Sequence, residues 1–122
     1  MAAFTPLEQA ALQAIFAETP DIVDSLQDQL LVAVVARREN TGAGFFTKIS
    51  VPEETKRVTS ARVLGNEVHA RVDGLRYGLG FVLFMEDGRL SLLEGYSCGG
   101  EDTTNLSFAD LAFRISKTPF DD

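Results

Sequence analysis

The sequence predicts an α+β domain in which two N-terminal helices pack on a curved antiparallel sheet of about five strands. Two observations lead to this prediction. Apolar residues recur at helical spacing over residues 7–30, and from residue 31 onward β-branched residues, alternation and turn signals take over. Because the chain contains no internal repeat, low-complexity tract or linker, we expect one domain over residues 1–122.

Two helix-start signals precede residue 22. Thr5 can cap a helix, Pro6 suits its first position, and Glu8 can return a hydrogen bond to the Thr5 amide. Residues 19–21 repeat this pattern with a threonine, a proline and an aspartate. Apolar residues follow each signal at helical spacing, so we expect two short amphipathic helices.

Three segments have the character of strands. Residues 31–38 are rich in valine and end at a turn-forming segment. Residues 45–51 alternate until Pro52 ends them, which predicts a second strand antiparallel to the first. Residues 67–73 alternate cleanly and predict a third.

The most specific local signal is Asp87-Gly88 between two apolar runs, which is typical of a two-residue type I′ turn. We therefore expect a β-hairpin over residues 79–96. Regular pairing from this turn places Met85 opposite Leu90 and Phe81 opposite Glu94. One face of the hairpin then holds Leu79, Phe81, Leu83, Met85, Leu90, Leu92, Glu94 and Tyr96.

The remaining segments carry weaker patterns. Residues 53–66 are polar, and we expect a surface connection with a short strand around residues 62–64. Residues 97–105 are glycine-rich and acidic, which predicts a loop. Residues 106–115 predict a short C-terminal helix, although residues 112–116 suit a final strand as well.

The charge balance argues against two classes of partner. Eleven basic and eighteen acidic residues give a net charge of −7, which repels nucleic-acid phosphates and anionic lipid. The longest apolar run, residues 30–36, is much shorter than the roughly 20 residues that span a bilayer. The first residues lack the basic and apolar regions of an export signal, so we expect none, and the one cysteine suits a reducing compartment. We expect a cytoplasmic protein without nucleic-acid or membrane partners.

Glu94 is the most informative polar residue under regular pairing, because its carboxylate then shares a face with the core. A buried carboxylate must be paired, hydrogen-bonded or protonated, as in a proton-transfer or ligand-binding group. The structural alternative is an acid satisfied by a backbone amide or by Arg37, Arg38 or Arg62. A bulge at Gly95 would instead turn it outward. The structural interpretation is favoured, since structural ion pairs also bury acids.

The loop after the hairpin places a thiol, carboxylates and hydroxyls beside Glu94. These oxygens suit a hard cation, but their spacing departs from that of a calcium loop, so we expect no metal and no cofactor. A solvated loop in which Asp102 or Thr103 caps the following residues is favoured. Residues 37–44 could present amides and a guanidinium group to an anion, although a hairpin loop explains them. The candidate ligand-binding residues are Glu94, Tyr96, Cys98, Glu101, Asp102 and Arg37.

A thiol enzyme has little support. Cys98 and His69 are the only possible nucleophile and base of this type, and His69 alternates onto a polar face between Glu67 and Arg71. The sequence lacks a nucleophile elbow and a zinc-binding histidine pair. We predict no catalytic residues.

The second face of the hairpin carries an apolar stripe that a half-exposed sheet would not need. Either a helix or another chain must cover it, and self-association as a homodimer is favoured. The interface candidates are Val82, Phe84, Leu93 and Phe46.

Two stretches, RRENTGAGFFTKISVP and GLGFVLFMEDGRLSLLEGYSCGGED, resemble a group of short uncharacterised bacterial α+β proteins. More loosely, the hairpin followed by LEGYS resembles small immunity-type proteins that neutralise a partner toxin. The resemblance covers about half of the chain and implies a fold and a protein partner, without catalytic residues.

The function expected from the sequence is therefore non-enzymatic: a binding or protein-interaction domain, self-associating or immunity-like, with a protein or a small ligand as partner. The alternative is a small hydrolase or isomerase that uses Glu94 as general base, assisted by Arg37, His69 or Cys98.

Overall fold

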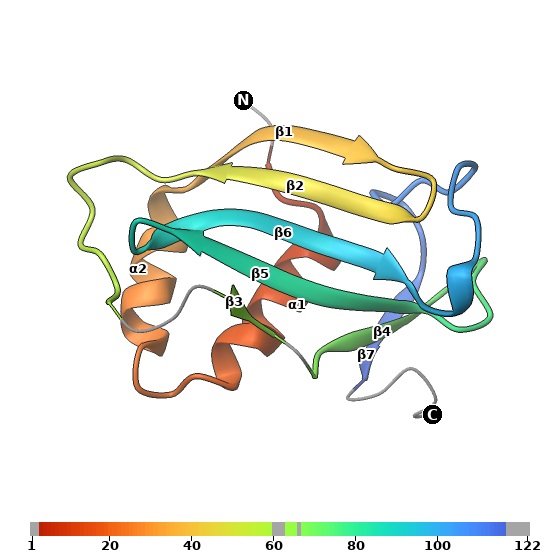
Figure 1. Ribbon diagram of the computed structural model, residues 1–122, viewed down its shortest axis with the longest axis horizontal. Coiled ribbons are helices and arrows are strands. Elements are labelled where there is room, and N and C mark those ends of the chain that lie inside the picture. Colours follow the sequence, from red (N-terminus) through yellow and green to blue (C-terminus); the bar gives the residue numbers. More distant parts are fainter. Residues whose placement is uncertain (1–2, 60–62, 66, 117–122) are drawn as a thin grey trace.

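The computed structural model describes residues 3–59, 63–65 and 67–116, and it shows an α+β fold with one open antiparallel sheet (Figure 1). The helices are α1 (Pro6–Ala17) and α2 (Val23–Val32). The strands are β1 (Val34–Asn40), β2 (Gly44–Ser50), β3 (Val63–Leu64), β4 (His69–Val72), β5 (Leu79–Glu86), β6 (Arg89–Ser97) and β7 (Phe113–Ser116). Their order is β1-β2-β6-β5-β4-β7, and β3 also pairs with β5. The α+β class is confirmed, with seven strands instead of about five.

The start of α1 follows the sequence prediction. The Thr5 hydroxyl accepts a hydrogen bond from the Glu8 N–H at 3.1 Å, and Glu8 Oε1 accepts one from the Thr5 N–H at 2.8 Å. Pro6 occupies the first helical position, where its missing N–H costs nothing. This capping box fixes the first turn of α1 and, with it, the place of the Glu8 carboxylate.

The predicted second helix start was wrong. Thr19 closes the last turn of α1, because its hydroxyl donates a hydrogen bond to the Phe16 carbonyl at 3.0 Å. α2 begins after Ile22, which makes no side-chain cap bond. Leu31, expected in a strand, lies in the last turn of α2 and is 84% exposed. Periodicity alone does not separate a short apolar strand from the end of a helix.

The C-terminal segment forms a strand instead of the expected short helix. β7 pairs with β4, so that Ile115 lies opposite Ala70 and Phe113 opposite Val72. These pairs satisfy backbone groups of β4 that would otherwise lie at an open edge. The short strand expected around residues 62–64 is confirmed as β3, whereas Arg62 lies outside the described residues.

The turn of the β5–β6 hairpin is the one predicted. Asp87 and Gly88 have φ angles of 53° and 74°, and a type I′ turn requires positive φ at both central residues. Met85 pairs with Leu90, as expected from this turn.

The register beyond Met85 was wrong, because β6 contains a bulge at Ser91. Phe84 pairs with Leu92 instead of Ser91, and every later residue of β6 is displaced by one position. Since side chains alternate between faces, this displacement exchanges the faces of Leu93 and Glu94. Leu93 is 0% exposed in the core, and Glu94 lies on the opposite face.

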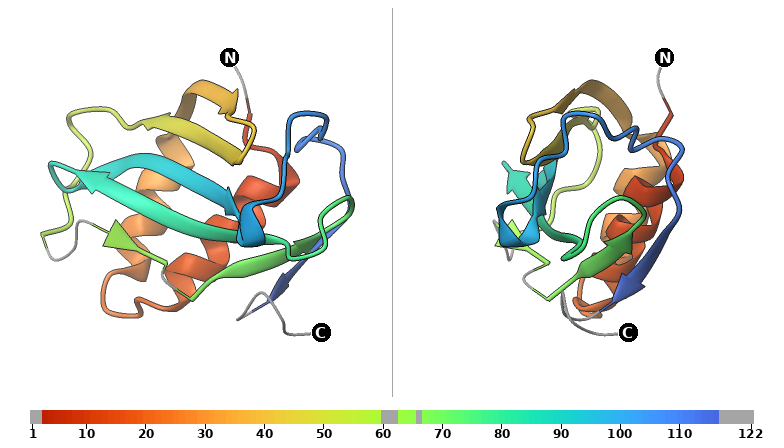
Figure 2. Two further views of the ribbon diagram at one scale, coloured as in Figure 1. Left: turned by 45° about the vertical axis from the view of Figure 1, so that its right-hand side comes forward. Right: turned by 90° about the vertical axis from the view of Figure 1, so that its right-hand side faces the viewer.

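Both helices cover the same face of the sheet (Figure 2). The core lies between them and includes Phe16, Leu26, Phe45, Phe81, Leu83 and Leu93. Among the described residues, no helix is long and apolar enough to cross a membrane.

Candidate functional site

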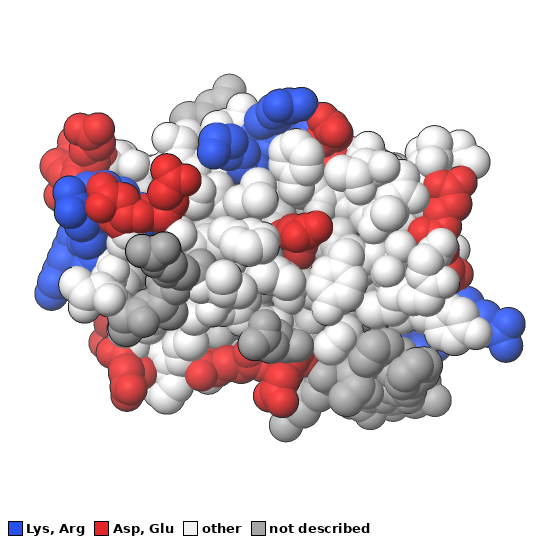
Figure 3. Space-filling view, in the orientation of Figure 1, with Lys and Arg blue, Asp and Glu red and all other residues white. Residues whose placement is uncertain are grey.

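The face of the sheet that the helices do not cover carries a group of mainly apolar side chains on three adjoining strands. We call this surface the open face, and its residues are Phe46, Val82, Phe84, Leu92, Glu94 and Tyr96. All of them except Tyr96 are half-buried, and Tyr96 is 37% exposed. Figure 3 shows acidic atoms at the centre of this otherwise uncharged surface and basic atoms along its upper rim.

Glu94 lies inside the open face and not in the core. Its strand neighbours are Phe46 on β2 and Val82 on β5, so apolar side chains flank it on both sides. Among the residues that the structure describes, no hydrogen bond or ion pair reaches its carboxylate. Glu94 is therefore a half-exposed acid that water can solvate, and the expectation of a buried carboxylate at this position was wrong. A bulge turns it outward, as the alternative interpretation had it, but the bulge lies at Ser91 and not at Gly95.

Tyr96 lies at one end of the open face because glycine occupies the position beside it. Tyr96 pairs with Gly80, and a Cβ atom at Gly80 would lie 2.3 Å from Tyr96 Cζ. The phenol end of the ring therefore rests on the backbone of β5. Burial raises the pKa of Tyr96, and the nearby Cys98 and Glu94 raise it further. These three residues lie close enough to interact electrostatically.

Arg37 lies at the opposite edge of this surface. Its guanidinium carbon is 5.5 Å from the centre of the Phe46 ring, a cation–π distance, and its Nη2 atom is 2.7 Å from Glu39 Oε1. Arg37 therefore extends the open face onto β1, and it does not pair with Glu94.

The carboxylates of the two acidic loop candidates accept hydrogen bonds within the protein: Glu101 joins the loop to the β4–β5 connection, and Asp102 bonds within the loop. Glu101 accepts hydrogen bonds from the backbone N–H groups of Arg76 at 2.9 Å and Tyr77 at 2.6 Å. Asp102 accepts bonds from the backbone N–H and the hydroxyl of Thr104, which hold the pKa of Asp102 below its usual value. Among the described residues, no three His, Cys, Asp or Glu side chains gather as a metal site would require.

Thr103 acts differently from a simple cap. It is fully buried, accepts the Gly44 N–H at 2.9 Å and donates its hydroxyl hydrogen to Asn40 Oδ1 at 3.0 Å. It thereby joins the loop to the β1–β2 hairpin.

The structure does not support Cys98 and His69 as a nucleophile and its base. Burial raises the pKa of the Cys98 thiol, and the negative charge of Glu101 raises it further, so the thiolate is disfavoured at neutral pH. His69 lies on β4, two strands from β6, opposite Gly80.

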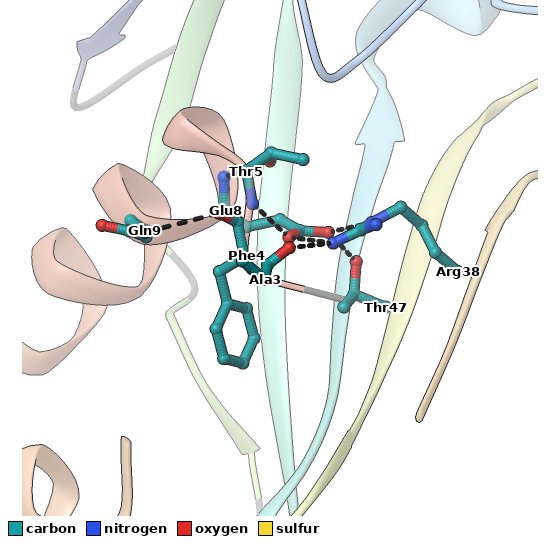
Figure 4. Close-up of polar contacts among 7 residues, drawn as sticks. All are labelled: Ala3, Phe4, Thr5, Glu8, Gln9, Arg38 and Thr47. Atoms are coloured by element: carbon teal, nitrogen blue, oxygen red, sulfur yellow. Dashed lines mark hydrogen bonds and ion pairs between the residues drawn. The ribbon is translucent and has the colours of Figure 1, made fainter. Parts of the chain in front are cut away.

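The sequence interpretation missed a buried acid at another position, Glu8 (Figure 4). Glu8 is 1% exposed, and Arg38 donates to both of its oxygens at 2.7 Å. The Thr47 hydroxyl and the Thr5 N–H donate to the same carboxylate. Burial raises the pKa of Glu8, but the hydrogen bonds from Arg38, Thr47 and Thr5 outweigh it and lower the pKa below its ordinary value.

The Glu8 cluster joins α1 to β1 and β2. Each carboxylate oxygen already accepts two hydrogen bonds, which leaves no lone pair for a substrate. The cluster is therefore structural. Its signal in the sequence was the alternation of β1, which places Arg38 on the face opposite to Arg37 and Glu39.

No protein-family model, no curated protein and no solved structure matches this chain.

Proposed function

We propose that this protein is a non-enzymatic interaction domain that binds another protein through the open face. The observation that carries the proposal is the position of Phe46, Val82, Phe84 and Leu92 on adjoining strands, opposite to both helices. A contiguous apolar surface rimmed by charged groups is typical of protein-binding sites. Tyr96 adds a large amphipathic side chain of the kind that is enriched in interfaces.

The β1 edge of the sheet is a less suitable binding surface than the open face. β1 presents Arg37, Arg38 and Glu39 in succession, and its register shifts between Val35 and Arg37. Charged side chains and bulges on an edge strand oppose pairing with a further strand. These features favour association through the face.

The placement of Glu94 favours binding over catalysis. A general base needs a group that positions it or tunes its pKa, and Glu94 is flanked by Phe46 and Val82. His69 is two strands away, about 10 Å at the usual strand spacing, and Arg37 pairs with Glu39.

A small ligand at the acidic loop is also less favoured. The carboxylates of Glu101 and Asp102 accept hydrogen bonds from neighbouring backbone N–H groups, which a ligand would have to replace. The likeness to immunity-type proteins stays a prediction from the sequence.

Photo-crosslinking in the cells that produce this protein tests the proposal. Tyr96 is replaced by p-benzoylphenylalanine, and Asp24, which is exposed on α2, is replaced in a matched control. We expect covalent protein adducts from position 96 and none from position 24. Equal yields from the two positions, or no adduct from position 96, would contradict an interface on the open face.

A further inference from the structure

The pairing of β2 with β6 places four side chains at the corners of one quadrilateral, which extends from the middle of the open face to Lys48 at its rim. Phe46 lies opposite Glu94, and Lys48 lies opposite Leu92. One diagonal therefore joins a base to an acid, and the other joins two apolar side chains. Directly opposite residues are about 5 Å apart and diagonal neighbours about 7–8 Å apart in such a pair.

We infer that the partner of the open face is a second copy of this chain, an inference that rests on the function proposed above. Consider a two-fold axis that lies in the plane of the interface along the Phe46–Leu92 diagonal. Rotation about this axis exchanges the positions of Lys48 and Glu94. Lys48 of one protomer then faces the partner subunit's Glu94, and the reverse pair forms by symmetry. Phe46 and Leu92 each lie near their own symmetry mates on the axis. Two-fold dimers with self-complementary surfaces are the commonest homo-oligomers.

The charges of the open face support this occupant. A partner that covered Glu94 with apolar atoms alone would bury an unpaired carboxylate, which is strongly unfavourable. Lys48 is exposed on the same face and supplies the missing cation from the second copy.

The face is also electrically balanced. Residues that pair with one another across β1, β2, β6 and β5 form rows over this face. The charged residues in these rows are two basic ones, Arg37 and Lys48, and two acidic ones, Glu39 and Glu94. The net charge of −7 therefore arises elsewhere on the molecule, so two copies can approach through this face without a local repulsion. A strongly basic partner would instead meet Arg37 and Lys48 at the rim.

The size of the surface predicts a weak dimer. β1, β2, β6 and β5, at about 4.8 Å spacing and about 3.4 Å per residue over seven residues, cover roughly 450 Å². This flat footprint is smaller than the roughly 800 Å² of accessible surface that each partner buries in a standard interface. We therefore expect a dissociation constant in the micromolar range or above, which determines the concentrations to be used.

Sedimentation equilibrium of the full chain from about 10 μM to about 1 mM tests the inference. The variants reverse the charge of Lys48 or of Glu94, because like charges that face each other across an interface are strongly unfavourable. Wild type is expected to dimerise, whereas Lys48→Glu and Glu94→Lys, each by itself, are expected to weaken the dimer about 100-fold or more, because each creates two like-charged pairs. An equimolar mixture of the two variants restores two opposite pairs and is expected to form a heterodimer. The double variant is expected to dimerise like wild type.

Lys56→Glu and Glu54→Lys are matched controls, because they make the same changes in charge at exposed positions outside the open face. Both are expected to dimerise like wild type. Circular dichroism of all variants establishes that each one is folded.

Three results would contradict the inference that the partner is a second copy of this chain. These are a wild type that stays monomeric at 1 mM, single variants that dimerise as wild type does, and a mixture that stays monomeric. If position 96 still crosslinks to a different protein, the proposed function holds while this inference fails. If position 96 forms no adduct and the wild type is monomeric, both fail.

Discussion

The Arg38 guanidinium group holds the Glu8 carboxylate through two hydrogen bonds of 2.7 Å and thereby fastens the first turn of α1 to β1. Glu8 also belongs to the capping box of α1, so one side chain fixes both the start of the helix and its position on the sheet. This makes Glu8 the acid with the greatest expected effect on stability.

Glu8→Gln should lower the free energy of unfolding by about 2 kcal/mol, because the buried side chain loses its charge-assisted hydrogen bonds from Arg38, Thr47 and Thr5, while the Arg38 side chain, 31% exposed, stays partly solvated. Urea unfolding followed by circular dichroism measures the change. Arg38→Gln should have an effect in the same direction, and the double variant should cost less than the sum of the two. Additive single effects would show that the two groups do not act as a pair.

Glu94→Gln provides the contrasting case. Because this carboxylate lies on the open face without a partner among the described residues, the substitution should change the stability of the monomer by less than about 0.5 kcal/mol. Urea unfolding at low micromolar concentration, below the expected dimerisation range, is the measurement. A loss as large as that of Glu8→Gln would place Glu94 in a structural role instead.

The stability should also depend on pH through Glu8. Its folded-state pKa is lowered from the ordinary value of 4.5, so the unfolded chain binds this proton first as the pH falls. The contribution of Glu8 should be complete at pH 7, begin to decline near pH 4.5 and disappear once the pH passes the folded-state pKa. The difference in unfolding free energy between wild type and Glu8→Gln should therefore shrink below pH 4.5, and a constant difference down to pH 3 would contradict this.

Gln29 fastens α2 to the hairpin turn from a fully buried position. Its Nε2 donates to the carbonyls of Lys56 and Gly88 at 3.0 and 2.9 Å, and its Oε1 accepts the Leu90 N–H at 2.9 Å. Gln29→Leu should cost about 2–4 kcal/mol, since it leaves the buried Leu90 N–H without its acceptor and removes two hydrogen bonds to the carbonyls of Lys56 and Gly88. The Leu90 amide should exchange with deuterium faster. Gln13→Leu, at an exposed helix position, serves as the control and should show neither effect.

Gly80→Ala should disturb the open face through Tyr96. The added Cβ would lie 2.3 Å from Tyr96 Cζ, so the ring must move away from β5, at a cost of about 1–3 kcal/mol. The cost should fall sharply in a Tyr96→Ala background, as a double-mutant cycle in urea would show. An equal cost in both backgrounds would place the strain in the backbone of β5.

The local signals of the sequence determined the start of α1, the hairpin turn and the α+β class. The Thr5–Glu8 capping box and the type I′ turn at Asp87-Gly88 need only residues close together in the chain, so their chemistry is visible in the sequence. Three of the four residues expected in the apolar stripe, Val82, Phe84 and Phe46, lie on the open face, whereas the fourth, Leu93, lies in the core.

Only the tertiary structure decided which acid is buried. The bulge at Ser91 exchanges Leu93 and Glu94 between faces, because one extra residue reverses a two-residue period from that point on. That displacement lets the Leu93 side chain, 0% exposed, fill the core and leaves Glu94 beside Phe46. Glu8 meets Arg38 across a separation of 30 residues, and the alternation of β1 gives the face of Arg38 without identifying its partner. The open edge of β4 likewise makes β7 a strand, since a distant backbone offers it hydrogen bonds that its own segment does not.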